Sequence, residues 1–135
     1  MEDLALLVLR LALGSVFIAH GAQKLFGWFG GPGLKGTAGF FEQIGIKPGS
    51  TMALLAGLAE FGGGLLVLLG FLTPVGALAI IAVMIAAIFR VHLANGFFNT
   101  SGGYEFNLSL IAVAAALLIA GAGAYSLDGV LGILW

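Results

Sequence analysis

Four long apolar runs restrict this chain to a fold that crosses a membrane. They cover residues 4–20, 51–72, 74–89 and 106–122. A helix needs roughly 17–25 mostly apolar residues to span a bilayer. The first two runs meet that length, and the other two meet it when extended through residues 90–93 and 104–105. Because backbone polar groups in hydrocarbon must bond within their own segment, each run is expected to be a helix.

Composition excludes a soluble globular domain. Of the 135 residues 61% are hydrophobic and 8% are charged, whereas a soluble domain carries about 25% charged residues. The net charge of −1 and the absence of a basic stripe argue against nucleic acid as a partner. The sequence has no cysteine, which excludes thiolate catalysis and cysteine-held metal sites within it. We therefore expect one transmembrane domain over residues 1–135, with the lipid bilayer as its surroundings.

The helix-terminating and capping residues between the apolar runs predict an all-α, integral membrane four-helix bundle. Its helices are expected over about residues 4–26, 51–72, 74–93 and 104–122. The glycine- and proline-rich segment 27–33 should end the first helix. Ser50 or Thr51 is the expected N-cap of the second helix, and Thr73-Pro74 fits an N-cap followed by proline in the first turn of the third. Glycines after residue 120 should end the fourth.

The first connection, residues 27–49, is long and rich in aromatic residues and glycine. Residues 37–44 are expected to form a short helix in the membrane–water interface, with Phe40, Phe41 and Ile44 facing lipid. A floppy surface loop is the plainer alternative. A third possibility is that the segment covers an opening between the helices.

Basic residues predict the orientation of the chain. With four spans, both termini lie on one side, and the first and third connections lie on the other, here called the far side. Lys35 and Lys47 occur in the first connection, with Lys24 and Arg90 close to the far side. The positive-inside rule therefore places the far side in the cytoplasm.

Ionisable side chains inside the apolar runs are the most informative feature. Charges in membrane helices are costly and generally face the bundle interior. Arg10 and Lys24 lie on one face of the first helix, and Glu60 lies in the middle of the second. Counted along the helices, Arg10 and Glu60 differ by roughly 7 Å in depth. We predict that these two side chains form an ion pair.

Polar groups from all four spans gather toward the far half of the bundle. They favour a pocket that binds a quinone or a small polar or anionic ligand, because a quinone combines hydrogen-bond-accepting carbonyls with an apolar tail. The histidines are candidates for proton transfer. The predicted catalytic residues are His20 and His92, and the predicted ligand-binding residues are Arg10, Lys24, Glu60, Arg90, Glu105 and Asn107.

The same ionisable residues also fit a structural or a metal-binding role. A structural network of ion pairs would likewise place charges inside the bundle. His20 and His92 could ligate a b-type haem, but two histidines on two helices are a weak signal. A metal site from the histidines with Glu60 and Glu105 lacks the close helical spacing of dedicated ligands. We expect no metal, favour a quinone over haem, and leave the cofactor undetermined.

The sequence resembles the DoxX family of bacterial membrane proteins over nearly its whole length. The resemblance is carried by Arg10, Gly14, Phe17, His20-Gly21 and Lys24-Leu25, by Glu60, Gly62-Gly63 and Gly70, by His92 and Gly96-Phe97-Phe98, by the run Gly102 to Leu108, and by Tyr125-Ser126-Leu127-Asp128. It implies a multi-pass protein of four helices in the bacterial inner (plasma) membrane. It also implies a link to membrane oxidoreductase complexes, by analogy of fold alone.

These observations lead to three hypotheses. The first is a redox-associated subunit that binds a quinone or small polar ligand. If such a protein is itself an enzyme, which the sequence leaves open, it belongs to a quinone-linked oxidoreductase. The second hypothesis is a small-solute carrier, which would need a homo-oligomer because four helices without an inverted repeat make a poor carrier. The third is a membrane scaffold for a partner oxidoreductase subunit.

Overall fold

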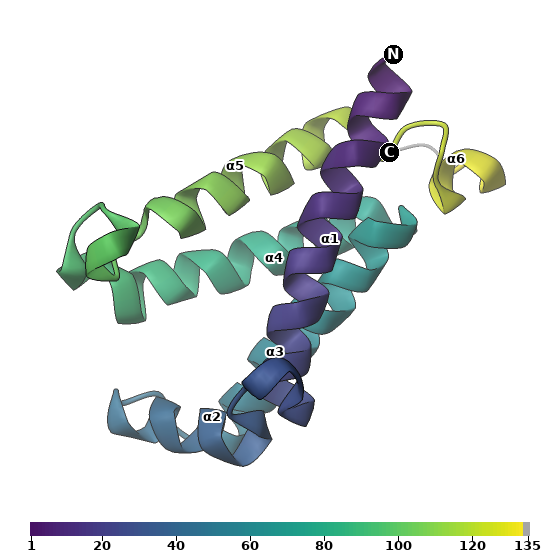
Figure 1. Cartoon of the computed structure of the whole chain (residues 1–135). Helices are drawn as coiled ribbons and strands as arrows, with labels where there is room; N and C mark the ends of the chain where they lie inside the picture. The colour runs from purple at the N-terminus through teal and green to yellow at the C-terminus, as the bar shows by residue number, and fades with distance from the viewer. Residues whose placement is uncertain (134–135) are drawn as a thin grey trace.

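The computed structural model describes residues 1–133 and is helical throughout its regular elements (Figure 1). The two final residues of the expected domain, 134–135, lie outside the described residues. In chain order the elements are α1 (Glu2–Phe26), η1 (Trp28–Gly30), α2 (Gly33–Gln43), α3 (Gly49–Leu69), α4 (Thr73–Ala87), η2 (Ile88–His92), η3 (Leu93–Asn95), η4 (Asn99–Ser101), α5 (Glu105–Ala120) and α6 (Leu127–Leu131).

Within residues 1–133, three helical stretches are long and apolar enough to cross a membrane: α1, α3, and the stretch Thr73–Asn95 that begins with α4. The all-α membrane fold predicted from the sequence is confirmed in this respect. The fourth apolar helix, α5, has 16 residues and is shorter than the usual span. A fourth crossing therefore stays a prediction.

α1 packs closely along α3, while α4 and α5 lie side by side and extend away from α1 (Figure 1). Small residues make the α1–α3 approach possible. A Cβ atom added to Gly64 would lie 2.7 Å from the backbone nitrogen of Ile18 and 2.9 Å from the carbonyl oxygen of Gly14. Glycine at this crossing therefore sets how near the two helices come.

The core lies where α1, α3, α4 and α5 meet. Its fully buried side chains include Phe17, Val67, Ile80 and Leu117. Many large apolar side chains on the opposite helix faces remain exposed, which is the pattern expected when lipid covers them.

Helix ends agree with the sequence in part. Gly27 adopts a left-handed conformation (φ 74°) directly after α1, as the glycine cluster predicted. The predicted cap of the second helix is wrong, because α3 begins at Gly49 after Pro48 without a side-chain cap. Thr73 is likewise not the N-cap of α4 but its first residue.

The N-terminus of α4 is capped by a residue far away in sequence. The carboxylate of Asp128, from α6, accepts hydrogen bonds from the Leu72 nitrogen (2.9 Å), the Thr73 nitrogen (3.1 Å) and the Thr73 hydroxyl (2.7 Å). The nitrogen of Asp128 also donates to the carbonyl of Gly70 (2.8 Å). The chain after α5 is thereby fastened to the turn between α3 and α4.

Candidate functional site

A large pocket occupies one half of the helical assembly. Its volume is about 790 Å³, and its walls come from α1, α2, α3, the α4–η2 stretch and α5. The contributing parts are the end of α1, the first half of α3, the end of α4 and the start of α5. These parts belong to the half of the bundle that the sequence identified as polar. The walls are nevertheless mostly apolar, with side chains such as Leu55, Val83 and Leu110.

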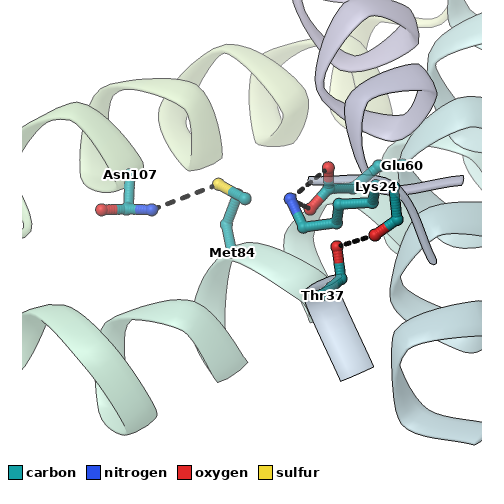
Figure 2. A network of polar contacts seen from close by, with 6 residues as sticks. Lys24, Thr37, Glu60, Met84 and Asn107 are labelled. Carbon is teal, nitrogen blue, oxygen red and sulfur yellow. Dashed lines mark hydrogen bonds and ion pairs between the residues drawn. The ribbon is translucent and has the colours of Figure 1, made fainter. Parts of the chain in front are cut away.

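An ion pair between α1 and α3 forms part of the wall. The ammonium group of Lys24 lies 3.0 Å from each carboxylate oxygen of Glu60, and Figure 2 shows the two side chains together. Glu60 is 2% exposed, while the side chain of Lys24 keeps 25% of its surface. An ammonium group has three donor hydrogens, so Lys24 retains donor capacity toward the pocket.

The predicted ion pair between Arg10 and Glu60 is wrong. Arg10 is buried on α1 but donates to the carbonyl oxygens of Leu68 (3.1 Å) and Tyr125, and it interacts electrostatically with Asp128. It therefore lies at the α3–α4 turn and not among the residues that line the pocket. Lys24 is the better partner for Glu60 because its position near the end of α1 matches the depth of Glu60 on α3.

His20 lines the pocket one helical turn from Lys24. Its ring lies between two aromatic rings, with centroid distances of 6.4 Å to Phe17 and 6.4 Å to Phe106. Both Lys24 and Glu60 act on it electrostatically. The structure thus places His20 beside the Lys24–Glu60 pair.

Asn107 lines the pocket from α5 and is 6% exposed. Its amide nitrogen lies 3.5 Å from the sulfur of Met84 on α4 (Figure 2). A thioether is a weak acceptor, so the amide can exchange this contact for a better one. Asn107 is suited to hydrogen-bond a ligand's polar group.

Arg90 and His92 line the pocket from the π-helical end of α4. Such π-helical turns often occur at functional sites. Arg90 donates to the carbonyl of Ile44, just beyond α2, at 3.4 Å. Nδ1 of His92 lies 2.8 Å from the carbonyl oxygen of Gly102.

Glu105 lies outside this pocket. One of its carboxylate oxygens accepts a hydrogen bond from the Asn99 nitrogen at 2.9 Å, and the residue lines a smaller pocket of about 230 Å³. The sequence placed it with the binding residues because it begins α5, but a carboxylate at that position caps the preceding loop instead.

The first connection contributes to the pocket wall. α2 supplies Thr37, Phe40 and Phe41 to the lining, so this segment lies at an opening between the helices. The helix runs over Gly33–Gln43, with Thr37 donating to the carbonyl of Gly33 at 2.8 Å (Figure 2), so the segment is not a floppy loop. Its position in the membrane–water interface stays a prediction.

Three residues were missed from the sequence. Thr37 and Met84 carry no signal of their own, because a lone threonine in a glycine-rich connection and a lone methionine in an apolar run are both ordinary. Asp128 gave a usable signal, since it is an acidic residue near the end of a chain that has few. Among the described residues, no group of three or more potential metal-ligating side chains occurs.

Known proteins resemble this chain along most of its length. The family model described as DoxX matches residues 5–93. Inner membrane protein YqjF of Escherichia coli is 36% identical over 137 residues, covering 100% of this chain and 98% of that protein. A Bacillus subtilis protein named "Putative oxidoreductase CatD" is 31% identical, covering 93% and 86%.

A membrane protein of Mycobacterium tuberculosis is 34% identical, with 92% of this chain and 79% of that protein covered. No solved structure matches. The family match includes nearly all of α1, all of α2 and α3, and α4 with η2, whereas the pocket residues of α5 lie beyond it.

Proposed function

The chain belongs to the DoxX family and is a multi-pass protein of the bacterial inner membrane, and on that premise we propose that it is a redox-associated membrane subunit whose pocket binds a quinone. The observation that carries the proposal is the ion pair of the half-buried Lys24 with the buried Glu60 in the wall of a large, mostly apolar pocket. Such a site accepts a molecule with one polar end and an apolar body.

The dimensions of the pocket agree with this ligand class. Ligand pockets generally measure about 300–1,000 Å³ and combine apolar walls with a few convergent polar groups, and this one measures about 790 Å³. Phe40, Phe41 and Leu55 offer apolar surface for a ring and tail. A water-soluble solute would leave that apolar surface without a partner.

The polar groups supply the hydrogen bonds that a quinone head needs. Lys24 retains donor capacity beyond the two contacts to Glu60, and Asn107 has only a weak sulfur partner. Quinone carbonyls are acceptors, so either side chain satisfies one. His20, close to the ion pair, is the residue we assign to proton exchange with the bound ring.

The name of one relative supports the redox assignment. The Bacillus subtilis protein CatD carries the name of an oxidoreductase. The sequence of this chain has no cysteine that could act as a redox thiol or hold an iron–sulfur cluster. We propose that the electrons reach the quinone from a partner subunit.

Binding of a short-tailed quinone to the purified protein tests the proposal. We expect decylubiquinone to raise the thermal unfolding midpoint of the protein in nanodiscs, because a ligand at 100 times its Kd stabilises the folded state by ~2.7 kcal/mol. Glu60→Gln and His20→Ala should remove most of this shift while the protein still inserts.

Glu105→Gln is the matched control, since it makes the same chemical change outside the pocket and should leave the quinone-induced shift intact. Equal shifts in the wild type, Glu60→Gln and His20→Ala would contradict the proposal. Mass spectrometry of lipids extracted with the wild-type protein gives a second readout, in which we expect an enriched native quinone.

A further inference from the structure

One hydrogen bond determines which ring nitrogen of His92 carries hydrogen. Nδ1 of His92 lies 2.8 Å from the carbonyl oxygen of Gly102. A carbonyl oxygen only accepts, so Nδ1 must donate. In the neutral imidazole the other nitrogen, Nε2, is then an acceptor with a free lone pair.

The surroundings hold the ring in this orientation. Gly102, at φ 75°, ends the η4 turn, and its carbonyl also accepts from the amide of Asn95 at 3.1 Å. Two backbone bonds close the same connection, from the Tyr104 nitrogen to Gly96 (3.1 Å) and from the Glu105 nitrogen to Phe97 (2.9 Å). The carbonyl is therefore fixed in place before any ligand arrives.

Within residues 1–133, Nε2 of His92 makes no hydrogen bond, and His92 lines the pocket. The other ionisable groups in the lining are His20, Lys24, Glu60 and Arg90. The lysine and arginine only donate, and both oxygens of Glu60 already contact Lys24. No described hydrogen bond sets the tautomer of His20. Among these ionisable groups in the described structure, His92 thus offers the acceptor that the fold itself orients.

We propose that Nε2 of His92 accepts a hydrogen bond from a hydroxyl group of the ligand. The inference rests on the proposed function and adds to it a preference between redox forms. A hydroquinone has hydroxyl hydrogens to donate, whereas a quinone has none. The pocket therefore binds the hydroquinone more tightly than the quinone, and His92 is the residue that sets this difference.

The substitution His92→Asn separates this role from a structural one. The asparagine amide can still donate to the Gly102 carbonyl from a position near Nδ1, but it has nothing in place of Nε2. We expect the wild type to bind decylubiquinol, kept reduced under argon, roughly threefold to tenfold more tightly than decylubiquinone, the usual contribution of one hydrogen bond. In His92→Asn the two affinities should become equal, because the acceptor for the hydroquinone hydroxyl is gone.

Nitrogen NMR supplies a readout that affinity does not. The chain has two histidines, so selective labelling with His20→Gln as the assignment variant gives one signal pair for each ring. We expect His92 to show hydrogen on Nδ1 and a lone pair on Nε2. Asn95→Ala, which removes the second donor to the same carbonyl, should leave both this tautomer and the hydroquinone preference in place.

Each result has a definite meaning. Equal wild-type affinity for the two redox forms, or a His92 ring protonated at Nε2 alone, overturns the inference while quinone binding itself stands. A hydroquinone preference that survives in His92→Asn also overturns it. Failure of the wild type to bind either form overturns both the inference and the proposed function.

Discussion

The approach of α1 to α3 gives the sharpest structural test, through the substitution Gly64→Ala. The new Cβ would lie 2.7 Å from the backbone nitrogen of Ile18 and 2.9 Å from the carbonyl oxygen of Gly14. Contacts of this kind normally exceed 3.4 Å. Because both neighbours are backbone atoms, no side chain can rotate away, and the helices must separate by about half an ångström or more.

The expected cost follows from two opposing effects. Overpacking typically destabilises a protein by ~1–3 kcal/mol, while alanine is favoured over glycine inside a helix by ~1 kcal/mol. We expect Gly64→Ala to lower the free energy of unfolding by about 1–2 kcal/mol. The separation should also loosen the contacts of 3.0 Å between Lys24 and Glu60, since these residues lie on the same two helices.

Gly62→Ala is the matched control, two residues away on the same helix. A Cβ at Gly62 meets nothing within 4 Å, so only the helix preference acts, and stability should stay equal or rise by up to ~1 kcal/mol. The free energies of unfolding are measured by steric trapping in bicelles. If the two variants were equally stable, the close approach of α1 and α3 would be refuted.

Two further predictions concern the buried charges. Asp128→Ala removes the cap of α4 and a partner of Arg10, so thermal unfolding should show a loss of stability of about 2 kcal/mol or more. The control Asp3→Ala removes one exposed hydrogen bond to the same C-terminal segment and should cost less than ~1 kcal/mol. If Asp3→Ala cost more stability than Asp128→Ala, the capping role of Asp128 would be contradicted. Lys24→Met should cost ~3–5 kcal/mol by leaving Glu60 buried without its partner, and Lys24→Met combined with Glu60→Leu should recover most of that loss. A double variant no more stable than the single one, measured by the same unfolding assay, would show that the lone carboxylate is not what destabilises the protein.

Helix positions were predictable because they depend on local properties of the chain. The expected first helix, 4–26, agrees with α1 (Glu2–Phe26), since hydrophobic length and the glycine after Phe26 act within the segment itself. The second and third helices agree within a few residues at most of their ends. Caps were less predictable, because the group that caps a helix end can come from a residue far away in the sequence, as Asp128 shows for α4.

The membership of the pocket was predictable in part. Six of the eight residues proposed from the sequence line it: His20, Lys24, Glu60, Arg90, His92 and Asn107. Arg10 and Glu105 do not. Depth along a helix identified most of the residues that lie in the same half of the bundle, but it does not predict direction around the helix axis or competing backbone partners.

The amino-acid sequence by itself determined that this chain is helical, that it lies in a membrane, and that charges in the middle of its spans, such as Arg10 and Glu60, are buried, because lipid tolerates neither unpaired backbone polar groups nor isolated charges. The pairing of those charges was decided only by the tertiary structure. The contact of α1 with α3 brings Lys24, and not Arg10, to Glu60, and the fold of the last connection selects the hydrogen-bearing nitrogen of His92. Such choices depend on how segments far apart in the chain pack against one another, which no local pattern records.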